Sequence, residues 1–271
     1  MLSILNSISS LTAENALSNT QASLQKTLTE LSTGLKINTG SDDAAGLSIA
    51  NGLQANISAL SQSSQNASDG VGLLQTADGA LSQVTTLLNR AVTLATEAST
   101  GGLSTSQATA LDTEYQSILT EIGNIGSTTN YNGEAIFGST ATVFTSDGTS
   151  SGSNTTSTAI GALTTAALGL TATDLTSTTT AQTALTDITA AISTVAANRG
   201  SIGAAVNQLT ASSNVESTEV TNLTSAENNV QNADIGQTVA QMTQFNVLEQ
   251  TGMAALSQSN QAQQAVEKLL Q

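Results

Sequence analysis

Two long apolar repeats limit what this chain can fold into more than any other feature. In each repeat, positions spaced alternately three and four residues apart are mostly apolar, which is the spacing of a coiled-coil seam. The first repeat runs through Leu53, Ile57, Leu60, Ser64, Ala67, Val71, Leu74, Asp78, Leu81, Thr85, Leu88, Val92 and Ala95. The second runs through Leu185, Ile188, Ile192, Val195, Arg199, Ile202, Val206, Leu209, Ser213, Glu216, Val220, Leu223, Glu227 and Val230. A seven-residue repeat held over this length predicts long helices with continuous seams.

The two repeats are expected to pack against each other, because each supplies only half of a seam. They lie on opposite sides of the chain's centre, so an antiparallel pair brings both chain ends together. Further apolar residues extend the pattern toward the ends: Leu17, Leu24, Leu28, Leu31 and Leu35 near the start, and Ile235, Val239, Met242, Leu256 and Leu270, less regularly, near the end. The predicted fold is mainly α, a long antiparallel coiled-coil rod formed by the N- and C-terminal segments, with a small β-hairpin and irregular central region.

The central part of the chain has a different composition. Residues 138–183 are rich in Thr, Ser, Gly and Ala, which disfavours helix and predicts short strands and turns. Asn132-Gly133 predicts a hairpin turn. One more helix is expected over 104–123, with an apolar face formed by Leu111, Tyr115, Ile118, Leu119 and Ile122. Polar residues interrupt the second repeat around 213–216, which predicts weaker packing there.

Charge and composition exclude several classes of function. The formal net charge is −15, and the five basic residues are scattered singly at Lys26, Lys36, Arg90, Arg199 and Lys268. Nucleic acid and anionic membranes are therefore not expected partners. The chain has no Cys and no His, which removes thiol nucleophiles, the commonest general base and the commonest zinc ligand. We predict no enzyme activity, no cofactor and no metal.

The stretch 32–52, STGLKINTGSDDAAGLSIANG, contains adjacent acids among several glycines. Asp42 and Asp43 could belong to a cation-binding loop, but two adjacent carboxylates without further spaced oxygens are too few ligands. A joint between two helices is the favoured interpretation. Gly34 and Gly40 would allow turns, and Ser41 or Asp42 would cap the next helix.

Several segments resemble those of bacterial flagellin. They are LSTGLKINTGSDDAAGLSIA (31–50), NASDGVGLLQTADGALSQV (66–84), NYNGEAIF (130–137), NRGSIGAAVNQL (198–209) and ADIGQTVAQMTQFNVLEQTGMAALSQSNQAQQAVEKLL (233–270). The resemblance covers about 11–137 and 185–271, in family order. It implies a secreted subunit of the extracellular flagellar filament that leaves the cell unfolded through the flagellar type III apparatus and self-assembles for motility.

The resemblance also implies a division of the chain and a set of partners. Residues 1–40 and 233–271 would form paired helices of the inner core, 41–138 and 184–232 the outer-tube helical domain, and 139–183 a short variable surface segment with β structure. The expected partners are other copies of the chain, an export chaperone, the cap protein, hook–filament junction proteins and a host Toll-like receptor.

Residue by residue, the family pattern places receptor contacts at Arg90, Leu94 and Glu114, although the sequence around Arg90 departs from it and Arg90 could equally be a solvated or subunit-contacting residue. Val266, Leu269 and Leu270 match a terminal pattern read by an intracellular sensor, for which core packing is the favoured interpretation. The predicted polymerisation contacts are Leu24, Leu28, Leu31, Leu35, Asp42, Asp43, Arg90, Leu94, Glu114, Val239, Met242, Leu256, Leu269 and Leu270.

Two other functions share parts of this pattern. A hook–filament junction protein would carry the same terminal motifs but would not polymerise indefinitely. A secreted coiled-coil adhesin or effector would use similar helices to bind a host surface. Failure to elongate filament seeds would favour the first alternative, and host binding without filaments the second.

Overall fold

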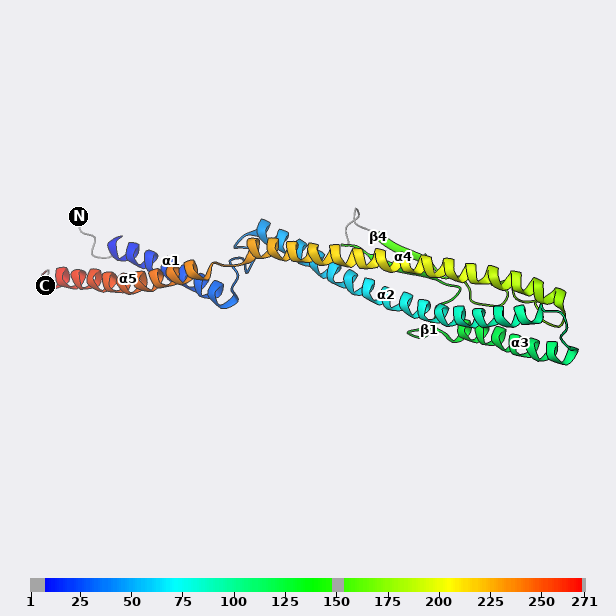
Figure 1. Cartoon of the computed structure of the whole chain (residues 1–271). Coiled ribbons are helices and arrows are strands. Elements are labelled where there is room, and N and C mark those ends of the chain that lie inside the picture. Colours follow the sequence, from blue (N-terminus) through cyan, green and yellow to red (C-terminus); the bar gives the residue numbers. More distant parts are fainter. Residues whose placement is uncertain (1–7, 148–153, 270–271) are drawn as a thin grey trace. The chain divides into compact units, whose positions relative to one another are not determined.

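The computed structural model describes residues 8–147 and 154–269, and most of them are helical (Figure 1). The helices are α1 (Ile8–Thr33), α2 (Ala44–Ala98), α3 (Thr105–Thr128), α4 (Thr178–Gln231) and α5 (Ile235–Leu269). The strands are β1 (Asn130–Tyr131), β2 (Glu134–Ala135), β3 (Thr140–Thr145) and β4 (Asn154–Ala159). Each strand pair is an antiparallel two-stranded sheet, β1 with β2 and β3 with β4. The prediction of a mainly α protein with a small β region is confirmed.

Packing divides the chain into two units. We call residues 1–55 with 222–271 the terminal unit, and residues 56–221 the central unit. The long helices α2 and α4 contribute residues to both.

In the terminal unit, α1 and α5 run antiparallel and side by side (Figure 1). The hydroxyl oxygens of Ser10 and Ser259 are 2.9 Å apart, and Gln21 Nε2 donates to Glu249 Oε1 at 3.2 Å. Leu17 lies against Gly252, where an added Cβ would be 3.4 Å from Leu17 Cδ1. The pairing predicted for the two chain ends is therefore confirmed for the described residues.

The central unit has the hydrophobic core. Leu74, Leu81 and Leu88 of α2 and Ile188, Ile202 and Leu209 of α4 are almost fully buried, as the repeats predicted. Alternate seam positions, such as Val71 and Val206, are half-buried and pack against this core. The predicted apolar face of α3 also joins it through Tyr115, Ile118, Leu119 and Ile122.

Polar residues that interrupt one repeat lie opposite polar residues that interrupt the other. Arg199 Nε and Asp78 Oδ1 are 2.7 Å apart, and Arg199 Nη2 donates to Asp78 Oδ2 at 3.2 Å. The Ser64 and Ser213 hydroxyl oxygens are 2.9 Å apart. Sliding α4 by one heptad would place both Asp78 and Ser64 against apolar seam residues, so the pairs favour the observed register over its nearest alternatives.

The helix α4 begins earlier than the threonine-rich sequence predicted. Residues 178–183 were expected to be irregular, yet Ser177 caps the helix by accepting from Thr180 N at 3.2 Å. Ala181 and Ala184 are fully buried in the core. The cap and this burial outweigh the weak helix propensity of threonine, which is why the composition alone was misleading.

The predicted Asn132-Gly133 turn is confirmed, since both residues have positive φ angles, 52° and 85°, and connect β1 to β2. The helix α3 begins at Thr105, next to the predicted start at 104 and capped by Ser104, and ends at Thr128, five residues beyond the predicted 123. The β3–β4 hairpin confirms the strands predicted for the central segment, and residues 148–153 lie outside the described part of the chain.

Reversing the Asp78–Arg199 pair tests whether it sets the register. Asp78→Arg and Arg199→Asp, each alone, should destabilise the central unit, because each puts like charges together. The double variant should recover about 0.2–1 kcal/mol of coupling, the range for partly exposed pairs. Chemical unfolding of the four proteins measures this coupling. Glu97→Arg, an exposed charge reversal on the same helix, should change stability by less than about 0.5 kcal/mol.

Candidate assembly surface and joint

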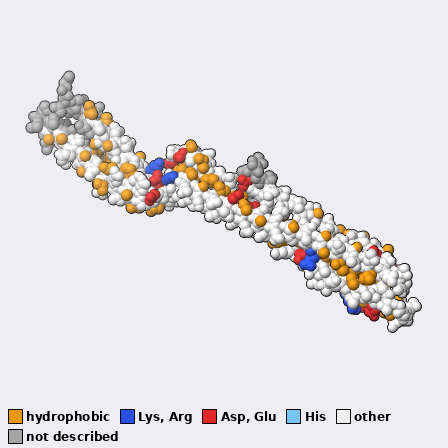
Figure 2. Space-filling view, turned by 45° about the horizontal axis from the view of Figure 1, so that its top comes forward, with side chains coloured by type: hydrophobic (Ala, Val, Ile, Leu, Met, Phe, Trp, Pro, Cys, Tyr) orange, Lys and Arg blue, Asp and Glu red, His pale blue; other side chains and the backbone are white. Residues whose placement is uncertain are grey.

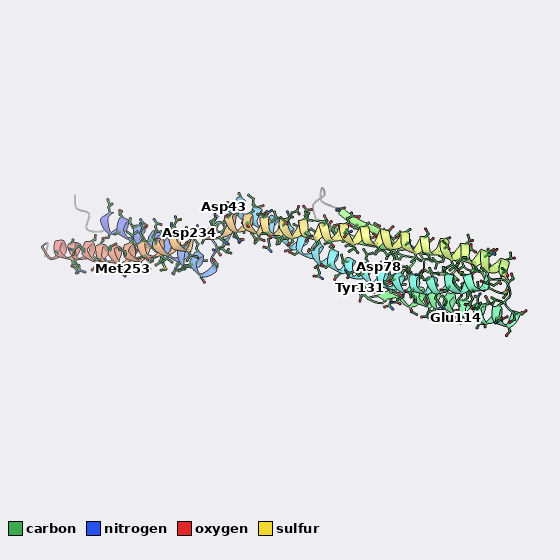
Figure 3. All side chains as sticks on the ribbon, in the orientation of Figure 1. Asp43, Asp78, Glu114, Tyr131, Asp234 and Met253 are labelled. Carbon is green, nitrogen blue, oxygen red and sulfur yellow. The ribbon has the colours of Figure 1, made fainter. Side chains whose placement is uncertain are left out.

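The terminal unit leaves large apolar side chains uncovered. Val247 is 53% exposed, Met253 49% and Leu28 46%. We call the exposed apolar residues of α1 and α5 the terminal apolar surface; they are Ile8, Leu11, Leu28, Ile235, Val239, Val247, Leu248 and Met253. Figure 3 labels Met253 on α5. Two paired helices bury only the stripe where they touch, so their outer faces stay uncovered within one chain.

The predicted terminal contacts fall into two groups. Leu28 and Val239 belong to the exposed terminal apolar surface. The others are half-buried, and they are Leu24, Leu31, Leu35, Met242 and Leu256. Leu24 and Leu31 continue the seven-residue spacing of Leu17, which contacts Gly252, so they face α5 within the same chain. Leu269 ends α5 but its side chain is outside the described part, and Leu270 lies outside the described residues.

The joint between α1 and α2 is organised by the two predicted acids. Asp43 Oδ1 accepts from the backbone N–H groups of Ala45 and Gly46 at 3.0 and 2.9 Å, so Asp43 is the cap of α2. The prediction of Ser41 or Asp42 as the cap was wrong by one or two residues. Asp42 instead stabilises the loop: its Oδ2 accepts from Thr39 N at 3.0 Å, and its Oδ1 is 3.1 Å from Lys26 Nζ.

A second connection, between α4 and α5, pairs with the first. Lys36 N donates to Gln231 O at 2.8 Å, and Ala233 N donates to Gly34 O at 2.9 Å. Gly34 has a φ of +75°, as predicted for a turn that favours glycine. Gly40 also lies in a turn as predicted, closed by Asp42 N donating to Thr39 O at 3.0 Å, but its φ is not positive and the turn does not require glycine. Asp234 begins α5 and accepts from Gln237 N at 3.1 Å. Figure 3 labels the two capping acids, Asp43 and Asp234, at the starts of their helices.

The electrostatics of this joint favour an ionised Asp42. Lys26 contributes most, followed by the N–H and O–H groups that Asp42 accepts from Thr39, and together they lower its pKa from 3.8 to about 2. The sequence pattern placed Asp42 in the joint but could not show Lys26 beside it, because Lys26 comes from the middle of α1.

The predicted receptor contacts lie in the central unit and do not form one surface. Arg90 Nη2 and Glu114 Oε1 are 2.7 Å apart, and both side chains are about half exposed at 54% and 47%. Leu94 is only 1% exposed and packs in the core. Leu94 is therefore corrected from a contact residue to a core residue, because the face of α2 that carries it turns toward the core.

Charged side chains are sparse on the surface that Figure 2 shows, and they gather in a few small groups. Across residues 8–147 and 154–269, no three or more Asp and Glu residues come together as a metal site would require. The search of those same residues finds no helix long and apolar enough to cross a membrane.

Long antiparallel helices that leave a terminal apolar surface exposed are typical of structural proteins that associate through their helices. The family model for the bacterial flagellin N-terminal helical region matches residues 4–142, and that for the C-terminal helical region matches residues 185–270. The chain belongs to the bacterial flagellin family.

Two flagellin sequences support this assignment. A flagellin of Halalkalibacterium halodurans is 36% identical over 248 residues, covering 91% of each chain. A flagellin of Serratia marcescens is 41% identical over 140 residues, which covers 51% of this chain and 40% of that one. The match thus spans less than half of the Serratia protein. The crystal structure of Bacillus cereus flagellin is 30% identical with a TM-score of 0.49, covering 56% of this chain and 88% of that chain.

The interactions of Asp42 predict that the stability of the joint between α1 and α2 depends on pH. Because the folded pKa is lowered, the stabilisation is present above pH 3.8 and is lost as the pH falls toward 2. Protection of the Thr39 amide from hydrogen exchange should decline over that window, and the Asp42 carboxyl carbon shift should titrate there.

Two lysine variants test whether Lys26 is the main cause of the lowered Asp42 pKa. Lys26→Met should raise the Asp42 pKa toward 3.8, whereas Lys36→Met should leave it nearly unchanged, since Lys36 Nζ bonds to Asn229 O instead. An Asp42 that titrates normally in the unmodified protein would show that the joint lacks this interaction.

Proposed function

We propose that this chain is a structural subunit of the bacterial flagellar filament, which polymerises by covering its terminal apolar surface with other copies of itself. The observation that carries the proposal is that surface on α1 and α5, which a single chain leaves exposed. Membership of the flagellin family supports the identity of the polymer.

The energetics favour assembly through these helices. Fully burying a side chain such as Val247 or Leu248 contributes roughly 1.5–3 kcal/mol, so several such contacts per subunit supply a large driving force. Repulsion between copies is modest for a chain of this charge, because only 9% of residues are charged and the surface is mainly Ser, Thr, Asn and Gln.

The proposal includes the division of the chain that the family resemblance implies. Residues 1–40 and 233–271 would line the inner core, and 41–138 and 184–232 would form the outer tube. Residues 139–183 would lie on the outer side of that tube but not as a free surface segment, because Ile160, Leu170 and Leu175 are buried in the hydrophobic core. Export by the flagellar type III apparatus, with the chaperone, cap and junction proteins as partners, belongs to the same proposal. A Toll-like receptor would contact the exposed Arg90 and Glu114 but not the buried Leu94.

A charge placed on the terminal apolar surface tests the proposal. Val247→Asp should leave the helical content of the monomer unchanged, because the side chain is exposed, but should block elongation of filament seeds. Because Val247 is already half-buried, the burial lost on assembly is about half of the 1.5–3 kcal/mol of a full side chain, which raises the critical concentration by roughly fourfold to tenfold. Elongation is followed by sedimentation and electron microscopy.

The matched control is Phe144→Asp, which puts the same charge on an exposed apolar residue of β3 in the central unit. It should elongate seeds normally.

Removing residues 1–40 or 233–271 should give a soluble, folded chain that does not polymerise. Normal filaments from Val247→Asp or from either truncated chain would refute this assembly mode.

A further inference from the structure

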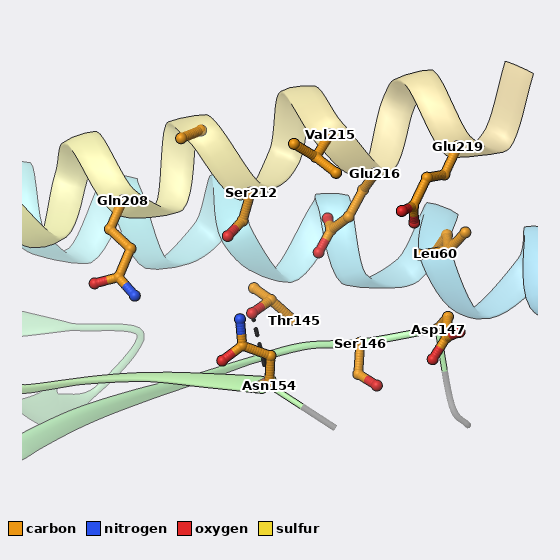
Figure 4. Close-up of a pocket in the computed structure, with 11 residues that line it drawn as sticks. Leu60, Thr145, Ser146, Asp147, Asn154, Gln208, Ser212, Val215, Glu216 and Glu219 are labelled. Atoms are coloured by element: carbon orange, nitrogen blue, oxygen red, sulfur yellow. Dashed lines mark hydrogen bonds between the residues drawn. The ribbon is translucent and has the colours of Figure 1, made fainter. Parts of the chain in front are cut away.

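A buried carboxyl group interrupts the α2/α4 seam under the β3–β4 hairpin. Glu216 occupies a seam position of α4 and is only 6% exposed. It lines a hollow of about 640 Å³ between the helix pair and the hairpin, shown in Figure 4. The described residues that line this hollow are Leu60, Thr145, Ser146, Asp147, Asn154, Gln208, Ala211, Ser212, Val215, Glu216 and Glu219.

Glu216 holds the end of β3 through one serine of α2. The Ser146 N–H, directly after β3, donates to Ser63 Oγ at 2.8 Å. The Ser63 hydroxyl, which accepts that hydrogen bond, in turn donates to Glu216 Oε1, also at 2.8 Å. A chain of two hydrogen bonds thus connects three segments that are far apart in the sequence: the end of β3, α2 and α4.

The β3–β4 hairpin packs closely on α2 and α4 beside these hydrogen bonds. A Cβ added to Gly70 of α2 would be 2.5 Å from Val143 Cγ2 and 3.2 Å from Leu209 Cδ1, so Val143 rests where only a glycine leaves room. Thr156, the partner of Val143 in the sheet, is also buried. Its Oγ1 and Glu216 Oε2 are the two buried side-chain polar atoms that lack a hydrogen-bond partner in the described part of the chain.

Among the described residues, no basic side chain pairs with Glu216. The charged groups that face it are both acidic: Glu219 on α4 and Asp147 after β3, while α2 presents Leu60 and Ser63. The sequence of the central unit contains only two basic residues, Arg90 and Arg199, and they pair with Glu114 and Asp78. Burial, and to a smaller degree Glu219, raises the pKa of Glu216 above its ordinary value of 4.5, against the opposing hydrogen bond from Ser63.

We infer that Glu216 is a protonation-dependent latch, which holds the β3–β4 hairpin on the α2/α4 pair when it is neutral and releases the β3 end when it ionises. A buried carboxylate with one hydrogen bond and no counter-ion is costly, and separating the hairpin from the helices lets water solvate it. The stabilisation is therefore complete below pH 4.5 and is lost as the pH rises through the raised pKa.

The test measures two quantities in the full-length monomer: the protonation of Glu216 and the opening of the β3 end at Ser146. The Glu216 carboxyl carbon shift reports its pKa, and exchange of the Ser146 amide, corrected for the intrinsic rate, reports hairpin opening. Protection of Ser146 should fall with rising pH by about tenfold for each pKa unit that separates folded from unfolded Glu216.

Two neighbouring variants identify the group responsible. Glu216→Gln keeps an acceptor for Ser63 but cannot ionise, so Ser146 protection should be independent of pH. Glu219→Gln removes a carboxylate one turn away and should retain the pH dependence. Equal pH dependence in Glu216→Gln would overturn the latch. If that variant does not fold, the unmodified protein still decides: a Glu216 pKa at or below 4.5, or flat Ser146 protection, overturns it.

Discussion

The packing of α2 against α4 is the interaction on which the central unit depends. The antiparallel seam carries most of the large buried side chains, and α3, both hairpins and the connecting segment before α4 add to it. An apolar seven-residue repeat can slide by one heptad at little cost, so apolar residues alone do not define one alignment. The Asp78–Arg199 and Ser64–Ser213 pairs favour the observed one, because a slide by one heptad would separate the partners and place these partly buried polar groups against apolar residues.

The terminal unit follows a different physical rule. Its α1/α5 seam mixes leucines with Thr27, Thr238 and small residues such as Gly252, and much of its apolar surface points outward. A pair of helices with this composition gains little from packing only on each other. Stable burial of the outer faces requires surface from other chains, which is the property expected of a subunit that becomes fully ordered on assembly.

Several particular elements were predictable from residue patterns and several were not. The seams, the face of α3 and the Asn132-Gly133 turn depend on local periodicity or on the φ preference of single residues, which sequence expresses directly. The start of α4 at Thr178 depends on a serine cap and on alanines buried by distant segments. The polar run at 213–216 predicted weak packing, yet its members bond to Ser63 and Ser64 on α2. Which of the two adjacent acids caps α2 depends on the backbone conformation of the loop between α1 and α2, and the identities of the two residues do not specify that conformation.

Long paired helices with a β-containing centre follow from the apolar spacing and the terminal motifs, which can be recognised from the order of residues alone. Which side chains are available for contact depends on the packing of the folded chain. Leu94 faces the core while Arg90, one turn earlier, faces outward, and Glu216 is buried although glutamate is normally exposed. The reason is that exposure depends on what each helix face meets across the fold, and helical spacing alone does not specify the neighbour.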